Sequence, residues 1–477
     1  MSVESTLPPA RHLPRAVAAI AVLSFYGALF LFTFHEADED VWGRLAVGRL
    51  IEATGHVALH DPFAYVPTLP VWVDHEWLSG LVMSRVRTSF GDSGLVWLRA
   101  LAGLGAVGFV LSTATRRASP WASAALAVAL AVLVLQGFNS IVRAQAFSFL
   151  FFAWFWWVLE RNGRLVWCLV PASALWANLH GGVATGLLLV GAYAVCERER
   201  RVELTAVGVL ATAATVLNPY GLEYWHYLAR ALVMPRPEIV EWRHVALWPA
   251  LDDLHLKLAA MLVATLVLSG QRIRNVEAVV LGGTLVASFL HVRFAPFMAF
   301  AMVVSLPRLL TDSFARGYSY FPHRWVPSLV PLMSTVLLLS LTCVGVIVGW
   351  NQRDLILRMR VPDDRYPVSA VRRLEETGAV GRLAVFFNWG EYALYHLYPD
   401  MRVSIDGRYE TVYPGDVTAL NWAFSGDGSS RLLELYPADY ALYPTGGRAD
   451  EWLEASPEWQ LLHRDDTAAL YAKRVPP

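Results

Sequence analysis

The chain has 477 residues, of which 56% are hydrophobic and 17% are charged, whereas soluble domains average roughly 25% charged residues. Its formal net charge of −1 gives no general attraction to nucleic acid, so a nucleic-acid partner is not expected. The three cysteines, Cys168, Cys196 and Cys343, lie within or beside apolar segments. They offer neither a disulfide framework nor a cysteine-rich metal site.

The apolar segments are numerous enough to predict a polytopic α-helical membrane protein. A spanning helix needs about 20 mostly apolar residues to cross roughly 30 Å of hydrocarbon. By this criterion residues 1–350 form a transmembrane domain of about 11 helices, and residues 351–477 form a more polar tail. Residues 76–90 are amphipathic, which favours a helix lying along the membrane surface. The predicted spans are residues 14–34, 93–114, 119–137, 144–159, 165–179, 181–196, 203–217, 256–270, 276–291, 294–310 and 326–350.

Positive charge predicts how these helices are oriented. Arginines occur in alternate loops between the predicted spans, and cytoplasmic loops of membrane proteins carry the excess of Lys and Arg. With eleven spans, this rule places the N-terminus in the cytoplasm, and the long loop 35–92 and the tail outside. Bulky residues follow the first span, where cleavage of a signal peptide would require small ones, so this span is predicted to be a retained helix.

The first external loop begins with four carboxylates within five residues: Glu36, Asp38, Glu39 and Asp40. One interpretation is a solvated acidic collar at the membrane surface. The functional interpretation is that one carboxylate acts as a general base, or that Asp38 and Asp40 bind a divalent cation such as Mg²⁺ or Mn²⁺. Loops longer than about 15 residues are usually functional or disordered, and the apolar pattern after Asp40 predicts a short ordered helix.

Three arginines lie on the predicted external side, where the positive-inside rule does not call for them. They are Arg143, Arg243 and Arg293. Arginine is suited to phosphate because its guanidinium offers two parallel donors and stays charged. A shared role in holding a lipid phosphate is the functional hypothesis. The alternative is that each side chain extends from a helix end to the interface without a ligand.

Two further external clusters contain histidine. Asn178 and His180 precede a Gly-Gly pair, which indicates either a tight turn or a site where His180 hydrogen-bonds a donor phosphate or sugar. His75 and Glu76 are also candidates for substrate binding. Two adjacent residues are a poor metal-ligand set without a third from elsewhere.

The tail predicts an α/β domain. Strand-like segments at 383–387, 402–406, 440–444, 459–464 and 468–473 alternate with helical patterns such as 367–377 and 389–397. No nucleotide-binding or hydrolase motif is present. Asp406 and Arg408 are candidate substrate-binding residues, and the alternative is a structural Asp–Arg pair.

The external motifs together resemble the GT-C superfamily of membrane glycosyltransferases, in particular bacterial members of uncertain substrate. An acidic Asp-x-Asp or Glu-x-Asp pair after one span is typical of that group. The region around Glu391 is loosely similar to the Trp-Trp-Asp-Tyr-Gly region of oligosaccharyltransferase catalytic subunits, but its acid is displaced by one position and the second Trp is missing. The resemblance rests on Asp38-x-Asp40-x-Trp42, Asp61-Pro62-Phe63, His75-Glu76-Trp77-Leu78, residues 175–182, Asn218-Pro219-Tyr220-Gly221 and Asp406-Gly407-Arg408.

This resemblance implies a GT-C-like helical domain with an extracytoplasmic C-terminal domain in a bacterial inner membrane. It implies a polyprenyl-phosphate-linked sugar as donor and an extracytoplasmic glycan, lipid or protein as acceptor. Asp40 or Asp38 would take the catalytic acidic position and deprotonate an acceptor hydroxyl during inversion at the anomeric carbon. Asp40 is preferred, because Trp42 and the helix after it would hold Asp40 in place.

Two alternatives stay open. One is an oligosaccharide ligase or polymerase that uses a lipid-diphosphate donor. The other is a non-catalytic transporter or scaffold of a cell-envelope polysaccharide pathway. Transporters place functional charge near the membrane midplane, whereas the charges here gather at one boundary. This distribution favours chemistry at the membrane surface.

Overall fold

The structure is a computed structural model. It describes residues 12–317, apart from residues 34, 162, 235–238, 240, 241, 243–253, 270 and 271, then six residues between 339 and 350, and residues 357–474. The eleventh predicted span lies outside the described part of the chain apart from those six residues. Arg243 also lies outside it.

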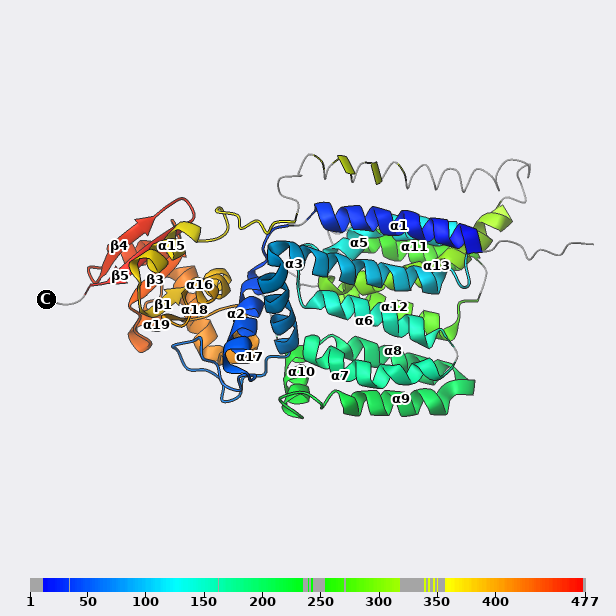
Figure 1. The fold of residues 1–477 in the computed structure, drawn as a ribbon, viewed down its shortest axis with the longest axis horizontal. Coiled ribbons are helices and arrows are strands. Elements are labelled where there is room, and N and C mark those ends of the chain that lie inside the picture. The colour runs from blue at the N-terminus through cyan, green and yellow to red at the C-terminus, as the bar shows by residue number, and fades with distance from the viewer. Residues whose placement is uncertain are drawn as a thin grey trace, which may run out of the picture.

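Apolar helices run side by side and form a bundle at one end of the molecule (Figure 1). Each of the ten predicted spans within the described residues coincides with a helix, part of a helix or two consecutive helices. Among the described residues, three helical segments are long and apolar enough to cross a membrane, Pro14–Phe32, Trp77–Ala114 and Val292–Leu310. The bundle comprises α1 (His12–Phe32), the second half of α3 (Trp77–Ala114), α4 (Pro120–Ala129), α5 (Ala131–Gln136), α6 (Gln145–Leu159), α7 (Leu169–Leu179), α8 (Val183–Cys196), α9 (Arg201–Ala214), α11 (Leu254–Ser269), α12 (Asn275–Leu290) and α13 (Ala295–Gly317).

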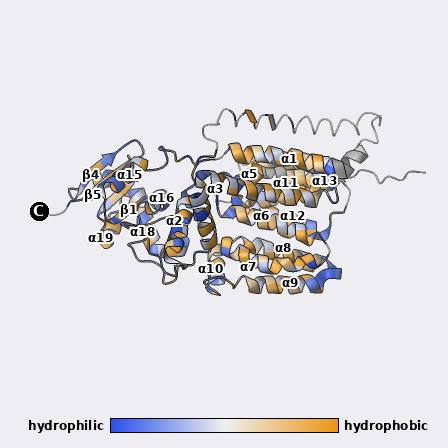
Figure 2. Cartoon of the chain, in the orientation of Figure 1, coloured by the Kyte–Doolittle hydropathy of each residue, from blue (hydrophilic) through white to orange (hydrophobic). Residues whose placement is uncertain are grey.

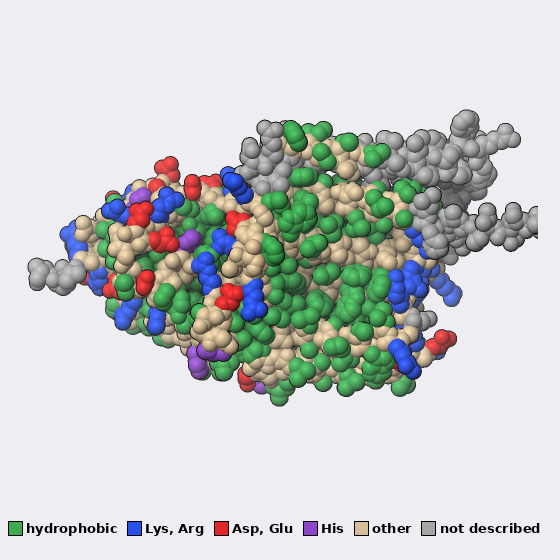
Figure 3. All heavy atoms as spheres, in the orientation of Figure 1, with side chains coloured by type: hydrophobic (Ala, Val, Ile, Leu, Met, Phe, Trp, Pro, Cys, Tyr) green, Lys and Arg blue, Asp and Glu red, His purple; other side chains and the backbone are tan. Residues whose placement is uncertain are grey.

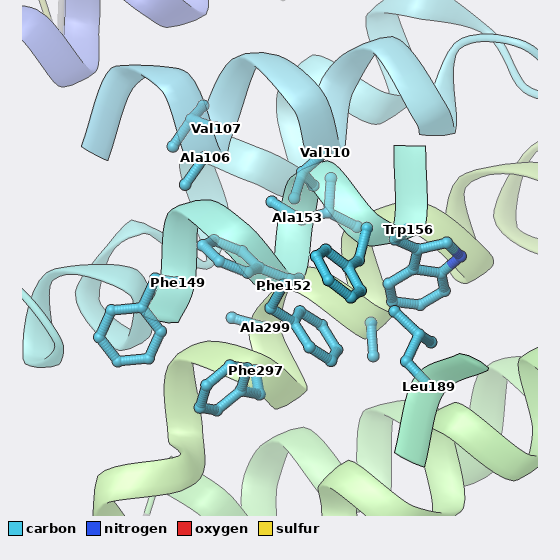
Figure 4. Packing of buried hydrophobic residues seen from close by; sticks show 14 of the residues in the cluster. Ala106, Val107, Val110, Phe149, Phe152, Ala153, Trp156, Leu189, Phe297 and Ala299 are labelled. Atoms are coloured by element: carbon cyan, nitrogen blue, oxygen red, sulfur yellow. The ribbon is translucent and has the colours of Figure 1, made fainter. Parts of the chain in front are cut away.

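The interior of the bundle is an aromatic and aliphatic core (Figure 4). The ring of Phe297 lies 4.9 Å from that of Phe149 and 4.8 Å from that of Phe152, which places α13 against α6. The outside of the bundle is also apolar: Leu188 is 74% and Leu217 is 72% exposed. A broad hydrophobic surface covers the bundle, and Lys and Arg gather at its end away from the C-terminal domain (Figures 2 and 3). This pattern fits a helix bundle surrounded by lipid.

The first external loop contains an ordered helix, α2 (Glu39–Thr54). The helix α3 begins at Trp77 and bends at Gly91, whose φ of 64° is non-helical, so residues 77–90 run across the end of the bundle beside α2 (Figure 1). The two helices cross closely, because a Cβ atom on Gly48 would lie 2.3 Å from the carbonyl oxygen of Gly80. The helix predicted at the surface over 76–90 therefore supports α2.

The C-terminal domain is an α/β unit with one five-stranded sheet of order β2-β1-β3-β5-β4. The pairs β1–β2 and β1–β3 are parallel, whereas β3–β5 and β4–β5 are antiparallel. Each strand overlaps one of the five predicted segments. The strands are β1 (Gly381–Val385), β2 (Met401–Val403), β3 (Tyr440–Pro444), β4 (Trp459–Arg464) and β5 (Ala468–Lys473), and the helices are α15 (Val368–Thr377), α16 (Gly390–Leu397), α17 (Tyr409–Val412), α18 (Gly415–Asp427), α19 (Arg431–Leu435) and α20 (Arg448–Ala455).

The first external loop and the C-terminal domain share one hydrophobic core. Trp42 on α2 packs against the rings of Tyr392 and Tyr395 on α16, at 5.0 and 5.1 Å. Beyond α2, the loop pairs with the edge strand β2: Val403 N donates to Phe63 O at 3.0 Å. The predicted boundary near residue 350 separates the chain by composition. The loop 35–92 nevertheless packs as part of the C-terminal unit.

Candidate functional site

The acidic cluster of the first loop lies at the start of α2, where the chain leaves the bundle. Asp38 is the N-cap of α2 and accepts a hydrogen bond from Asp40 N at 3.1 Å. Arg143, just before α6, has its Nη2 2.7 Å from Asp38 Oδ2 and 3.6 Å from Asp40 Oδ2. The side chain of Asp40 is 56% exposed, against 11% for Asp38. These three predicted site residues are therefore adjacent, and Asp40 is the more accessible acid.

A buried arginine fixes the chain at this point. Arg99 on α3 is 1% exposed and donates hydrogen bonds to the carbonyl oxygens of Thr33, at 2.7 Å, and Ser140, at 2.6 Å. The first contact holds the end of α1, and the second holds the segment that precedes Arg143. Arg99 therefore positions the backbone on both sides of the Asp38–Arg143 pair.

Arg44 on α2 binds the two carboxylates that flank His75 in the sequence. It lies four residues after Asp40 and so on the same face of α2. Its Nη1 is 2.5 Å from Asp74 Oδ1, and its Nε is 3.6 Å from Glu76 Oε2. The side chains of Arg44 and Asp74 are only 8% and 3% exposed. Sequence reasoning did not select Arg44, although its spacing from Asp40 was a usable signal.

His180 lies on the other side of Glu76. Its Nε2 is 3.3 Å from Glu76 Oε1. Its Nδ1 accepts a hydrogen bond from Gly182 N at 2.9 Å and lies 2.7 Å from Ser148 Oγ. Because a backbone N–H can only donate, Nδ1 is the unprotonated nitrogen, and Nε2 carries the hydrogen that points to Glu76. The Gly-Gly turn therefore sets the tautomer of His180.

The environment makes His180 neutral and Glu76 charged. Burial lowers the pKa of His180 to about 4, although the charge of Glu76 acts in the opposite direction. Burial alone would raise the pKa of Glu76, but the contact with His75 and the charge of Arg44 hold it well below its usual range. At neutral pH the pair is thus an imidazole donating to a carboxylate.

The lowered pKa of His180 predicts a loss of stability in mild acid. Below the usual pKa of about 6.5, His180 is protonated in the unfolded chain. In the folded chain it stays neutral until the pH falls to about 4. Stability is therefore complete above pH 6.5 and falls as the pH decreases towards 4, by on the order of 2 kcal/mol at pH 5. Melting temperatures of wild type and His180→Gln at pH 7.5 and pH 5 measure this effect.

The variant should lose less stability between these two pH values than the wild type. His226→Gln is the matched control, since the side chain of His226 is 69% exposed. The same pH dependence in wild type and His180→Gln would contradict the prediction.

His75 and Asn178 connect the same region to neighbouring elements. The ring of His75 stacks on Tyr227 of α10 (Glu223–Val233) at 4.7 Å, and Tyr227 donates to Glu410 of α17 at 2.7 Å. Asn178 accepts a hydrogen bond from Trp77 Nε1 at 2.8 Å. His75 thus lies where the loop, the bundle and the C-terminal domain meet, whereas the amide of Asn178 joins α7 to α3.

Asp406 and Arg408 form a buried ion-pair network. Arg408 is bound by both carboxylate oxygens of Asp406, at 2.9 and 2.7 Å, and by Asp61 Oδ1 at 2.7 Å. The side chains of all three residues are at most 1% exposed. Tyr413 also donates to Asp406 at 2.7 Å. This geometry favours the structural alternative for the pair, because the network joins the loop to the C-terminal domain and leaves no exposed group for a substrate.

Glu391 lies between the acidic cluster and this network. It is 4% exposed, and its Oε2 accepts a hydrogen bond from Gly43 N of α2 at 2.9 Å. Burial, and next the charge of Asp40, raise the pKa of Glu391 well above its usual range. Glu391 is therefore a neutral acid next to Asp40. The sequence placed Glu391 in a region loosely similar to an oligosaccharyltransferase motif, but Glu391 was not among the predicted site residues.

Arg293 lies at the short turn between α12 and α13. Its guanidinium carbon lies 4.5 Å from the centre of the Trp242 ring, and His291 Nδ1 is 2.8 Å from Trp242 O. The positive charge of Arg293 is one of the groups that lower the pKa of His180, after burial and together with the charge of His75. Arg243 is outside the described residues.

Metal binding stays a prediction. Within the described residues, no group of three or more His, Cys, Asp and Glu side chains is arranged to hold a metal ion. A cation at Asp38 and Asp40 would have to share these carboxylates with Arg143 and take further oxygen ligands from elsewhere.

Comparison with known proteins gives matches in structure only. No family model and no curated protein matches the chain. Arabinofuranosyltransferase AftD from Mycobacteria is 15% identical with a TM-score of 0.57, covering 97% of this chain and 40% of its own. The Archaeoglobus fulgidus oligosaccharyltransferase, tethered with an acceptor peptide, is 13% identical with a TM-score of 0.56, covering 91% and 69%. ArnT from Cupriavidus metallidurans is 14% identical with a TM-score of 0.51, covering 96% and 97%.

At this level of identity the similarity establishes the fold. The chain shares the fold of these solved structures, in agreement with the resemblance of its external motifs to the GT-C superfamily. The similarity covers the helical bundle together with the C-terminal α/β domain, because the matches extend over 91% of the chain or more. The shared fold and the apolar helices support a membrane location.

Proposed function

Because the chain has the GT-C fold, we propose that it is an integral-membrane glycosyltransferase that takes a sugar from a polyprenyl-phosphate carrier. The acceptor is an extracytoplasmic glycan, lipid or protein. The observation that carries the proposal is the charge arrangement at the end of the bundle. One accessible carboxylate, Asp40, lies there among paired and buried charges, next to Arg143. Oligosaccharyltransferase and arabinofuranosyltransferase structures share the fold that supports these residues.

The proposed reaction is a single displacement with inversion. The carboxylate of Asp40 accepts the proton of an acceptor hydroxyl, and the resulting oxygen forms a bond to the anomeric carbon of the sugar. The bond between that carbon and the phosphate oxygen breaks, and polyprenyl phosphate leaves with the electron pair. Arg143 and Arg293 are proposed to bind the phosphate, since a guanidinium stabilises the negative charge that develops on it.

The remaining charges have positioning roles in this proposal. Arg44 pairs with Asp74 and Glu76, and its side chain is 8% exposed. We therefore propose that it fixes the position of α2 and does not bind a substrate. His180 extends the same chain of contacts to the α7–α8 turn. A hollow of about 500 Å³ adjoins this turn at the outer ends of α3, α7 and α9. Its walls are mainly apolar and include Trp77 and Leu217, which suits the first isoprene units of a lipid carrier.

Arg293→Gln tests the proposed donor site. Loss of one charged hydrogen-bonding group costs about 1.5–3 kcal/mol, or roughly 10- to 100-fold in affinity. Binding of undecaprenyl phosphate to the purified protein, followed by tryptophan fluorescence, should weaken by that factor. Arg358→Gln is the control, since Arg358 is exposed.

Unchanged affinity in Arg293→Gln would remove Arg293 from the donor site. The same titration with undecaprenyl diphosphate examines the alternative of a lipid-diphosphate donor. Tighter binding of the diphosphate than of the monophosphate would favour the alternative function, an oligosaccharide ligase or polymerase.

A further inference from the structure

A second concave surface lies at the opposite end of the bundle from the candidate site. It is a groove of about 610 Å³ between α1, α3 and α4. Its floor is made of small and aliphatic residues, among them Ala16, Ala19, Leu23 and Gly108. The small side chains leave space here: among the described residues, a Cβ atom added to Gly108 would have only Leu23 within 4 Å, at 3.9 Å. The proposed reaction uses none of these residues.

Three guanidiniums line this groove. Arg15 belongs to the first turn of α1, Arg116 follows α3, and Arg161 follows α6. Arg161 lies over the Trp157 ring at 3.5 Å and donates to Ser112 Oγ at 3.4 Å. Burial and then the charge of Arg116 lower the pKa of Arg161, so the two cations are close enough to repel. An anion at this position would relieve that repulsion.

Neighbouring arginines at the same end are satisfied within the protein. Arg117 Nη2 is 2.8 Å from Glu160 Oε2, and Arg274 Nη1 is 2.8 Å from Glu160 Oε1. Within the described residues, no carboxylate lies within ion-pair distance of Arg15, Arg116 or Arg161. The positive charge of the groove is therefore not neutralised by the carboxylates that pair with Arg117 and Arg274.

The shape of the groove specifies the kind of anion. Arg15 and Leu23 lie eight residues apart on α1, which corresponds to about 12 Å along a helix. The groove thus has arginines at one end, which we call its mouth. From there an apolar channel runs along α1 towards Leu23. A soluble phosphate would contact the mouth alone. A glycerophospholipid would place its phosphate among the arginines and the first part of an acyl chain against Leu23 and Gly108.

We propose that this groove binds one anionic phospholipid from the membrane leaflet at the arginine-rich end of the bundle. The phosphate and an anionic headgroup contact Arg15, Arg116 and Arg161, and one acyl chain lies between α1 and α3. Each Lys or Arg near an anionic lipid surface adds to the attraction. Three of them around a shaped apolar channel give selection for phosphatidylglycerol over phosphatidylcholine. This site is independent of the proposed transfer reaction.

The test is native mass spectrometry of the purified full-length protein with phosphatidylglycerol or phosphatidylcholine added in equal amounts. Wild type should retain one phosphatidylglycerol at least 10-fold more than phosphatidylcholine. The double variant R15Q/R116Q should lose this preference. The control R164Q/R198Q removes the same charge from exposed residues in loops at the same end and should keep it.

A second variant tests the shape of the groove without changing its charge. Gly108→Leu fills the channel beside Leu23 and should reduce phosphatidylglycerol retention about 10-fold. Inorganic phosphate should not displace the lipid. Equal retention of both lipids by wild type, or equal loss in the control and in R15Q/R116Q, would overturn the proposal. Displacement by inorganic phosphate would also overturn it, because the ligand would then be a free anion.

Discussion

Asp40→Asn is expected to reduce sugar transfer by about 10²- to 10⁴-fold, the usual contribution of a general base. The amide has nearly the same shape as the carboxylate but cannot accept the proton of an acceptor hydroxyl. The fold should be retained, because the side chain is 56% exposed and the N-cap of α2 is Asp38. Transfer from a polyprenyl-phosphate-linked sugar to an added acceptor, measured on purified protein of checked melting temperature, gives the result.

Glu39→Gln is the matched control for this experiment. It removes one negative charge from the same first turn of α2, where the helix dipole favours anions. Transfer by Glu39→Gln should stay close to that of wild type. Equal activity of Asp40→Asn and wild type would exclude Asp40 as the base. If Asp38→Asn alone abolished transfer, the catalytic role would move to Asp38.

The sequence predicted the bundle well because lipid imposes a simple requirement. A spanning helix has to be apolar along its length, so segments such as 93–114 and 276–291 stand out by composition. The strands of the tail were predictable for a similar reason, since short apolar runs alternated with helical patterns. The number of eleven spans stays a prediction, because the last predicted span lies largely outside the described residues.

The sequence predicted several of the residues at the site, but not which residues they contact. Residues such as Asp40, Arg143 and His180 were identified because charged and polar residues gather at one end of the apolar segments. Other residues of the site were harder to predict from the sequence. Arg44 lies within an ordinary amphipathic helix, and Glu391 is 348 residues from Gly43, which donates to it. Contacts of this kind depend on how the loop folds onto the C-terminal domain, which local periodicity does not encode.

Asp406 and Arg408 illustrate the same limit. A cluster of charged residues after a strand has the same sequence pattern whether it binds a substrate or holds two parts of the protein together. The difference lies in burial, and here both side chains are at most 1% exposed. The partner that completes the network, Asp61, belonged to one of the motifs that carry the resemblance but was not predicted to pair with Arg408.

Arg408→Met is accordingly expected to act on stability rather than on substrate binding. The substitution leaves the carboxylates of Asp406 and Asp61 buried without their cation, and breaking such a pair costs about 3–5 kcal/mol. Thermal unfolding of the full-length protein should show a lowered midpoint. Arg448→Met is the control: Arg448 and Glu451 are 67% and 58% exposed, and an exposed pair contributes at most about 1 kcal/mol.

The triple variant D61N/D406N/R408M separates a structural role from a binding role. It removes the two orphaned charges together with the guanidinium, so the desolvation cost of unpaired carboxylates disappears. Most of the stability lost in Arg408→Met should return, because the network serves to hold the loop 35–92 on the C-terminal domain. If Arg408→Met unfolded at the wild-type temperature but transferred sugar poorly, Arg408 would instead contact a substrate, as the sequence first suggested.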